Sequence, residues 1–396
     1  MARYWARMFA ERVSGTASAN IWNTDTYKYK GTTKSIAAGT INKDYILPDV
    51  EDGPGLNMQS VNVPWQISSF GSYGGVRLAG SEIMTVGGQF TTALFSENAE
   101  WLLRHALVSY KKRNGQPFYA GDTFSFAVAR SFVDADNSTQ HELYTGCKFS
   151  DVSLACSDQA PILRAGFGIV GSTKSYLAGG STDTYTGDAA KYCAEPTACD
   201  GYPKDIYTFQ DMKLYMADTG TSANIQVTEV RNLSLSFRNM LDPIFGQSRN
   251  VQTLQRTMCE MSWSAEFTMT ILGDDDTTTL KPAANLNMTN SQWLRYKLEK
   301  LKDGTTGAAF PIEFQFFSNE NNNALKFKIG KTLITSVSDV MPMSRTFTVR
   351  VGGVAMLDDS CNNFTIEFGS AAMMADGKFE FVPASGSEPD SAAITI

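Results

Sequence analysis

Short segments throughout this sequence alternate apolar and polar residues, and this pattern limits the possible folds more than any other feature. In DTFSFAV, Phe124, Phe126 and Val128 alternate with Ser125 and Ala127. The segments DMKLYM, NLSLSFRN, LKFKIG, RTFTVRVGG and NNFTIEF repeat the pattern. A period of two residues places one side of a strand on a core and leaves the other side in solvent. The sequence therefore predicts a mainly β fold.

Two segments have the spacing of amphipathic helices instead. The first is expected to begin near Ser96, an acceptable N-cap, and the second near Thr289, where Thr289 and Gln292 form a capping-box pattern. Gly304 is expected to end the second helix. The expected apolar positions are Trp101, Leu102, His105 and Val108 in the first helix, and Trp293, Leu294, Leu298 and Leu301 in the second.

Composition and charge exclude some classes of protein. The chain of 396 residues has a net charge of −7 and a sequence pI near 5.1. Binding to nucleic acid needs clustered Lys and Arg that neutralise phosphates, so a broad basic interface is not expected. No apolar run approaches the roughly 18 residues of a membrane span. The N-terminal residues lack the continuous apolar core of a secretory signal, and we expect synthesis in a cytoplasm.

Candidate metal-binding and catalytic residues are sparse. The only histidines are His105 and His141, and no Gly-x-Ser-x-Gly or Gly-rich phosphate loop occurs. The DADN segment from Asp134 lacks the Gly and Glu of a calcium loop. The acidic run Asp274–Asp276 is expected to be a solvated loop, with cation binding as the alternative. We therefore predict no catalytic, cofactor-binding or metal-binding residues, no cofactor, and no enzymatic activity.

The cysteines do not form a metal-binding pattern. None is part of a Cys-x-x-Cys pair, and most are expected to be buried free thiols. Cys193 and Cys199 lie close together in YCAEPTACDGYP and would bridge only under oxidising conditions, so their pairing is left open. The six cysteines are Cys147, Cys156, Cys193, Cys199, Cys259 and Cys361.

Landmarks in the two halves of the chain occur in the same order, which predicts a duplicated domain. Gln89–Thr91 resembles Glu266–Thr268, and Trp101-Leu102 resembles Trp293-Leu294. The remaining matches pair Phe124-x-Phe126 with Phe314-x-Phe316, and Pro161, Arg164 and Gly171 with Pro342, Arg345 and Gly352. The alternative is that any two β-rich halves can be matched by eye.

Composition shifts suggest the boundaries of these units. The segment 173–206 is rich in Gly, Ser, Thr and Pro and is the best candidate for a linker. We expect an N-terminal arm at 1–45, a first domain at 46–172, a second domain at 207–382 and a C-terminal arm at 383–396. The arms are expected to become ordered only on assembly.

The segments YTGCKFSDVSLAC, YTFQDMKLYM and EVRNLSLSFRNMLDPIFG, with GGQFTTALF followed by EWLLRHAL, resemble the major tail tube proteins of long-tailed bacteriophages. The resemblance covers roughly 46–375. It implies two tandem β-sandwich or barrel-like domains, each with one flanking helix, plus extended arms. It also implies strands that join edge to edge into rings, and stacked rings that conduct DNA through a lumen.

For this chain the resemblance implies homotrimeric, pseudo-hexameric rings in a virion tail, assembled in the host cytoplasm. The implied partners are other copies of the chain, the tape-measure protein, the tail terminator and tail-tip proteins. DNA would pass without specific binding, and we expect an acidic lumen wall that repels phosphates. The alternatives are a tail-tip, baseplate or injection-machine ring protein, and a β-sandwich protein that binds glycans at a surface.

Overall fold

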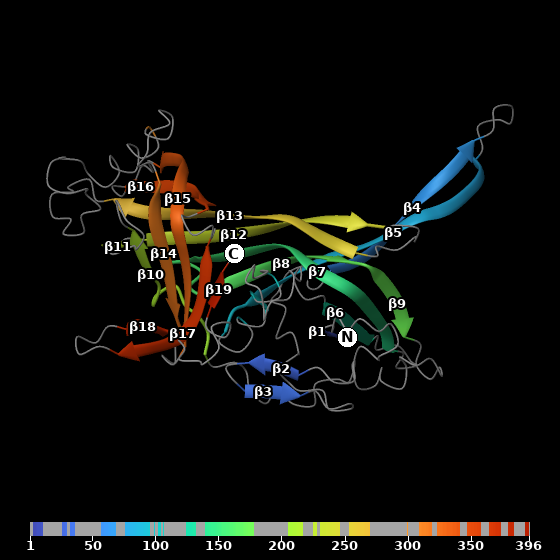
Figure 1. The fold of residues 1–396 in the computed structure, drawn as a ribbon, viewed down its shortest axis with the longest axis horizontal. Coiled ribbons are helices and arrows are strands. Elements are labelled where there is room, and N and C mark those ends of the chain that lie inside the picture. Colours follow the sequence, from blue (N-terminus) through green and yellow to red (C-terminus); the bar gives the residue numbers. More distant parts are fainter. Residues whose placement is uncertain are drawn as a thin grey trace.

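The fold is mainly β, as the alternating pattern predicted. The computed structural model describes residues 3–10, 26–29, 32–35, 57–68, 76–95, 99, 102–103, 106, 124–131, 139–177, 205–216, 225–227, 230–245, 253–269, 299, 309–318, 323–340, 347–357, 364–373, 379–383 and 393–395. Of the strands in these ranges, seventeen belong to one connected sheet, and β2 (Thr26–Tyr29) and β3 (Thr32–Ser35) form a separate hairpin. Figure 1 shows the arrangement.

The first half of the chain builds its part of the sheet around the long strand β7. The C-terminal part of β7 pairs with β8, which pairs with β5, which pairs with β4. The N-terminal part of β7 lies between β6 and β9, and β6 pairs with β1. The bounds are β1 Arg3–Ala10, β4 Asn57–Ser68, β5 Val76–Ala93, β6 Phe124–Ser131, β7 Thr139–Ser157, β8 Arg164–Gly171 and β9 Thr173–Leu177.

The second half repeats this pairing around β15. The C-terminal part of β15 pairs with β16, then β13, then β12. The N-terminal part lies between β14 and β17, and β14 pairs with β10. The bounds are β10 Lys213–Met216, β12 Val230–Ile244, β13 Thr253–Met269, β14 Phe310–Phe317, β15 Ala324–Val340, β16 Phe347–Met356 and β17 Thr365–Met373. Outside this pattern, β11 (Ile225–Val227) pairs with β10, and β18 (Phe379–Pro383) and β19 (Ala393–Thr395) pair with β17.

Three β-bulges occupy matching places in the two halves. The first interrupts β4–β5 after Val63, and its counterpart interrupts β12–β13 after Met240. The second lies between β6 and β7, with a counterpart between β14 and β15. The third lies between β7 and β8, with a counterpart between β15 and β16. A bulge fixes the register because it adds a residue to one strand only. The bulges therefore give a residue-by-residue correspondence between the halves.

This correspondence differs from the landmark matches made on sequence. In the structure Gln89 corresponds to Ser264 and not to Glu266. Phe124 corresponds to Phe310 and not to Phe314. Gly352 corresponds to Gly168 and not to Gly171. A strand repeats its sides every two residues, so an alignment by apolar pattern slips by two residues at Gln89 and by four at Phe124 without a visible conflict. The glycine match is off by three residues, which the alternation does not explain. Pro342 and Arg345 lie outside the described residues.

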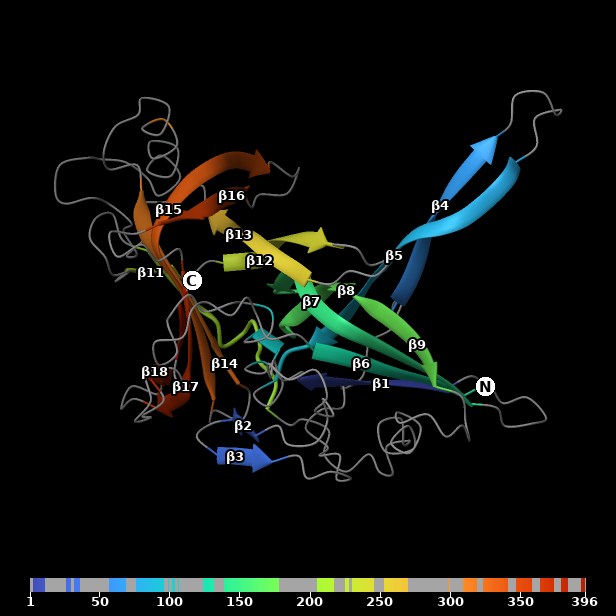
Figure 2. The same ribbon diagram turned by 45° about the vertical axis from the view of Figure 1, so that its right-hand side comes forward.

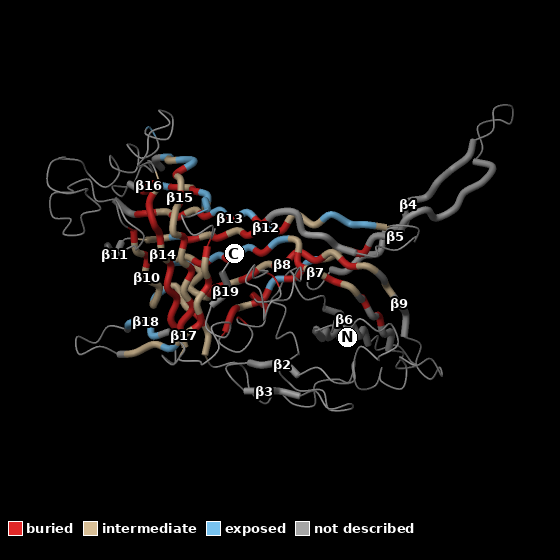
Figure 3. Tube along the Cα trace, viewed as in Figure 1, coloured by how far each residue is buried: buried red, intermediate tan, exposed pale blue. Residues whose placement is uncertain are grey.

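The two halves share one sheet and one core. The C-terminal part of β7 pairs with β12, so the sheet continues from the first half into the second (Figures 1 and 2). Buried side chains of both halves form a single apolar cluster, visible as the red segments of Figure 3. Tyr207, the first residue of the expected second domain, is tied to the first half by backbone hydrogen bonds: it accepts from Leu163 N and donates to Leu94 O.

The helical residues described include only part of each expected helix. Ala99, Leu102, Leu103 and Ala106 are helical and buried, and Glu299 is helical and exposed. Leu102 was expected on the apolar face, whereas Ala99, Leu103 and Ala106 were not. The other residues expected on the two apolar faces, with Thr289, Gln292 and Gly304, lie outside the described residues.

Parts of the expected linker and arms belong to the sheet. Residues 173–177 of the expected linker form β9 and pair with β7. The expected N-terminal arm contributes β1, which pairs with β6, and the expected C-terminal arm contributes β19, which pairs with β17. These segments pair because strands β6, β7 and β17 offer open backbone groups at their edges.

A large and a small residue exchange places between the halves. Trp263 lies opposite Gly353 on the neighbouring strand, and the corresponding pair in the first half is Gly88 and Ile169. The Trp263 indole donates to the Thr332 hydroxyl over 2.7 Å. A Cβ at Gly353 would lie 2.6 Å from the Trp263 ring and 2.8 Å from the Leu333 carbonyl oxygen. Gly353 is therefore needed for the indole to lie flat against β16.

Gly353→Ala is expected to lower the free energy of unfolding by about 2 kcal/mol, because an added methyl overpacks a filled core. Gly87→Ala is the matched control, since its Cβ would meet only the Ile169 carbonyl oxygen at 3.5 Å. Urea denaturation followed by fluorescence measures both variants. Equal stabilities for the two variants would contradict the proposed packing of Trp263 on Gly353.

Candidate assembly surface

The junction between the halves is an antiparallel strand pair with a buried side. Strand β12 pairs with β7 from Asn232 opposite Ser157 to Arg238 opposite Asp151. On the buried side Leu235 lies opposite Leu154, and Phe237 opposite Val152, each at most 1% exposed. The apolar-polar alternation of NLSLSFRN specifies this side, as expected for a strand with one face on a core.

An asparagine anchors β12 beyond the end of this pairing. The Asn239 side chain is 5% exposed, and its Nδ2 donates to the Ala106 carbonyl oxygen over 2.6 Å and to the Phe149 carbonyl oxygen over 3.0 Å. Asn239 therefore connects β12 to β7 and to the helical segment of the first half. Sequence analysis missed this residue, because a single Asn in a strand pattern gives no sign of its partners.

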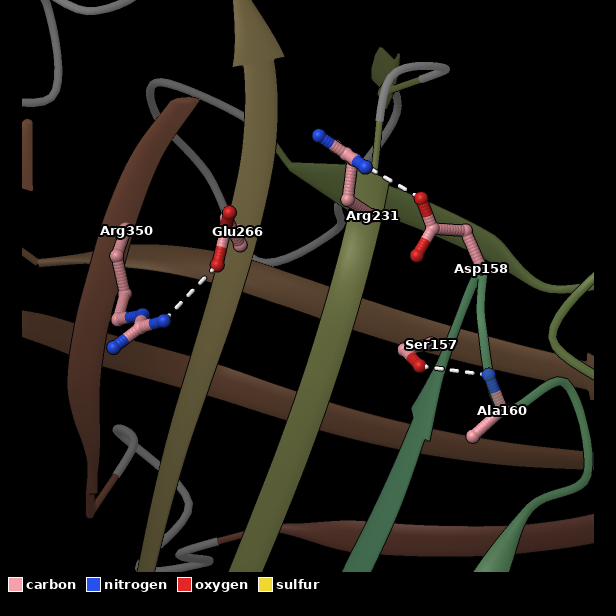
Figure 4. Close-up of polar contacts among 6 residues, drawn as sticks. All are labelled: Ser157, Asp158, Ala160, Arg231, Glu266 and Arg350. Carbon is pink, nitrogen blue, oxygen red and sulfur yellow. Dashed lines mark hydrogen bonds and ion pairs between the residues drawn. The ribbon is translucent and has the colours of Figure 1, made fainter. Parts of the chain in front are cut away.

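Polar contacts close the other end of the junction (Figure 4). The Asp158 amide donates to the Arg231 carbonyl oxygen over 2.9 Å, and the Arg231 guanidinium pairs with the Asp158 carboxylate at 3.0 Å. The Ser157 hydroxyl accepts from the Ala160 amide and shapes the turn after β7. Both charged side chains are about 40% exposed, so the ion pair contributes at most about 1 kcal/mol. The packing of the buried side holds the junction.

The strands β4 and β15, which correspond to β12 and β7 of the junction, each have an edge with no paired strand among the described residues. Within the described residues, β4 pairs with β5 alone. Over Ile334–Val340, β15 pairs with β16 alone within the same residues. These edges lie at opposite ends of the molecule, and the β4–β5 hairpin projects away from the rest of the sheet (Figures 1 and 2). A surface with two different edges at opposite ends suits head-to-tail association.

The side of the sheet opposite the core is lined with small polar residues. It crosses from the first half to the second without interruption, because β7 and β12 are paired. We call it the serine face, and its serines are Ser153, Ser234, Ser236, Ser262, Ser264, Ser336 and Ser338.

Charged residues of both signs lie on the serine face. Asp151, Glu260 and Glu266 are acidic, and Arg238 and Arg350 are basic. Arg350 pairs with Glu266 at 3.1 Å (Figure 4). Lys148 and Arg164 add positive charge near β8. The described part of this face therefore has no excess of acidic residues.

A buried polar cluster lies in the first half, away from these edges. The Glu142 carboxylate is 3.0 Å from Lys174 Nζ and accepts a hydrogen bond of 2.5 Å from the Tyr144 hydroxyl. Burial and the adjacent Glu142 carboxylate raise the pKa of Tyr144 far above its usual value. The cluster is internally paired and its Glu142 is 3% exposed, so it has the features of a structural element of the core.

Of the histidines and acidic residues considered on sequence for chemistry, the structure describes only His141. His141 lies in β7, opposite Ala129 and Leu177. His105, Asp134, Asp274–Asp276, Cys193, Cys199 and Cys361 lie outside the described residues. The part of the chain that the structure describes contains no group of His, Cys, Asp and Glu residues arranged to hold a metal ion. In that same part, no helix is long and apolar enough to span a bilayer.

Cys156 lies in β7 at the junction, opposite Leu233, and burial raises the pKa of its thiol to about 12. We expect iodoacetamide at pH 8 to leave Cys156 unmodified in the folded protein, because the thiolate is the reacting species. Peptide mass spectrometry after labelling, with and without urea, measures this. The urea sample is the control and should be labelled fully. Rapid labelling of Cys156 without urea would contradict a closed junction.

The sequence also matches a known protein family. The family model for phage tail tube proteins matches residues 81–292, more than half of the chain. A comparison with curated proteins found no match. The matched region extends from within β5 past the end of β13 and therefore includes the β7–β12 junction. With a mainly β fold and a match of this extent, the chain belongs to the phage tail tube protein family, a family of structural components of the virion tail rather than of enzymes.

Proposed function

We propose that this chain polymerises into stacked rings that form the tail tube and conduct DNA into the host. Membership of the tail tube family carries the proposal, because it implies self-assembly within a phage tail. The two strand edges at opposite ends support it further, since a head-to-tail contact closes into a ring when the rotation between copies allows it.

The proposed ring contains three chains, each contributing two duplicated units. The support is the repeated pairing order and the three matching bulges, which independent β-rich halves have no reason to share. We place the units at 46–172 and 207–382, with β9 added to the first and β1 joining it from the N-terminal arm. Six units then surround the axis.

The serine face is the proposed wall of the lumen. It is continuous across both units, and its short uncharged side chains present few groups that bind phosphates. Its mixed charges replace the expectation of an acidic wall: carboxylates accompany the cationic residues on this face, and Glu266 pairs with Arg350.

The proposed partners are those of a tail tube: further rings of the same chain, the tape-measure protein, the tail terminator and tail-tip proteins. Assembly in the host cytoplasm is part of the same proposal. The family match weighs against the alternative of a protein that binds glycans.

Negative-stain electron microscopy with mass photometry of the purified protein tests the proposal. We expect hollow rings or tubes and a mass step of three chains. A protein that remains monomeric at every concentration and in the presence of tail-tip proteins would overturn it. Rings of six chains would retain the tube and reject the duplicated-unit account.

A further inference from the structure

The geometry points to a specific register between neighbouring copies: β4 of one chain pairs with the C-terminal part of β15 of the next, as β12 pairs with β7 inside the chain. The inference rests on the proposed function, because it needs copies that meet head to tail. It adds the residues that meet and the residue that fixes their register. The second copy is the only partner it requires.

The bulges supply the correspondence on which this inference depends. The register shift after Val63 in the β4–β5 pairing matches the one after Met240 in the β12–β13 pairing, and the extra residue lies in β5 and in β13. The bulge after Ile334 in β15 matches the one after Phe149 in β7. Both strands of the internal junction therefore have a counterpart with a fixed register. Those counterparts, β4 and the C-terminal part of β15, each have a single paired strand among the described residues.

The residue pairs between copies follow when the register of β12 with β7 is applied to β4 of one copy and β15 of the next. Ser236 opposite Ser153 becomes Gln59 opposite Ser338 of the next copy, and Arg238 opposite Asp151 becomes Val61 opposite Ser336. Between them Ser60 lies opposite Val337, which is only partly buried against the core in the single chain. A new strand at this edge would complete the cover of Val337, as β12 covers Val152.

The transferred pairs are less apolar than their internal models. Met58 and Ser60 take the positions of Leu235 and Phe237, and Asp339 takes that of Leu154. An edge that faces solvent before assembly is less prone to unwanted pairing when it carries polar and charged residues. We therefore expect the contact between copies to be weaker than the junction inside the chain.

An asparagine recurs at the anchoring position. The residue of β4 in register with Asn239 is Asn62, and the residue of β15 in register with Phe149 is Ile334. Asn239 bonds the Phe149 carbonyl oxygen across the internal junction. In the ring, Asn62 would donate to the Ile334 carbonyl oxygen of the next copy. A single directed bond of this kind opposes a slip by two residues, which the alternating pattern alone permits.

Cysteine cross-linking in the assembled full-length protein tests the register. The variant Gln59→Cys with Ser338→Cys is oxidised and examined on a non-reducing gel, with each single substitution as a control for the native cysteines. We expect covalent multimers after assembly and monomers in the dilute subunit. Gln59→Cys with Ser336→Cys reports a slip by two residues, and stronger linking in that variant would overturn the inference.

Hydrogen exchange on the unmodified protein gives a second, independent result. The amides of 57–61 and 335–340 should become protected on assembly. If microscopy shows tubes but these amides stay unprotected and no cross-link forms, the register is wrong and the proposed function stands. If neither rings nor tubes form, the proposed function itself fails.

Asn62→Ala is expected to raise the critical concentration for assembly about tenfold, the equivalent of losing one or two buried hydrogen bonds. Asn57→Ala removes the same side chain from a position where only backbone pairing is expected. This variant should change the critical concentration less than twofold. Light scattering against concentration measures both. Assembly of Asn62→Ala at the unsubstituted protein's concentration would overturn the role assigned to Asn62.

Discussion

Phe237→Ala is expected to lower the free energy of unfolding by about 3–5 kcal/mol, the usual cost of truncating a large buried aromatic residue. Phe237 is fully buried on β12, with ring centroids 5.0 Å from Phe364 and 5.8 Å from Phe327. It also lies opposite Val152 across the junction. Its removal therefore leaves a cavity where the two halves share their core.

Urea denaturation of the unassembled subunit measures this effect. Ile244→Ala is the control on the same strand, because Ile244 is 42% exposed and should cost less than about 0.5 kcal/mol. The loss of unfolding free energy in Phe237→Leu should lie between the losses in Phe237→Ala and Ile244→Ala. A loss below 1 kcal/mol for Phe237→Ala would show that the halves do not depend on this shared core.

Lys174→Met is the second substitution with a large expected effect. It leaves the Glu142 carboxylate buried without its ion-pair partner, and the expected loss is about 3–5 kcal/mol. Arg350→Met breaks an ion pair in which the arginine side chain is 58% exposed, so it should cost less than about 1 kcal/mol. The comparison separates a buried pair from a surface pair in one chain.

The second half of the chain suggests how to restore the lost stability. In register with Glu142 and Lys174 it has Phe327 and Phe364, both buried and apolar. We expect the triple substitution Glu142→Leu, Tyr144→Phe and Lys174→Met to recover at least half of the loss, because no polar group of the cluster then remains unpaired. Calorimetry and urea midpoints measure the recovery. A triple variant less stable than Lys174→Met would contradict the explanation.

The strands were largely predictable, and their register was not. Segments such as NLSLSFRN and RTFTVRVGG alternate strictly, so β12 and β16 follow from the sequence. The correspondence of Gln89 with Ser264 does not follow, because a two-residue slip preserves the alternation. The bulges that settle it depend on pairing between distant strands, which a local pattern does not contain.

The place of the junction between the halves was not predictable, because the β7–β12 pairing and the contacts of Asn239 appear only once distant strands are paired. The two similar units stay a prediction from the sequence, and edge-to-edge association stays an implication of the resemblance to tail tube proteins. Strand β9 does not stand out in the sequence, because TKSYL lies beside a Gly-rich stretch typical of a linker. In the first helix, the apolar face was predicted from large residues such as Trp101 and His105. The small residues Ala99 and Ala106, which are buried in the structure, were not part of that prediction.

Cryo-electron microscopy of the assembled particle, reconstructed without imposed symmetry, shows how neighbouring chains meet. We expect three chains per ring, six similar units around the axis, and β4 of each chain paired with β15 of the next in the register of Gln59 and Ser338. A ring of six chains, or neighbouring copies that meet without pairing these two strands, would contradict this expectation.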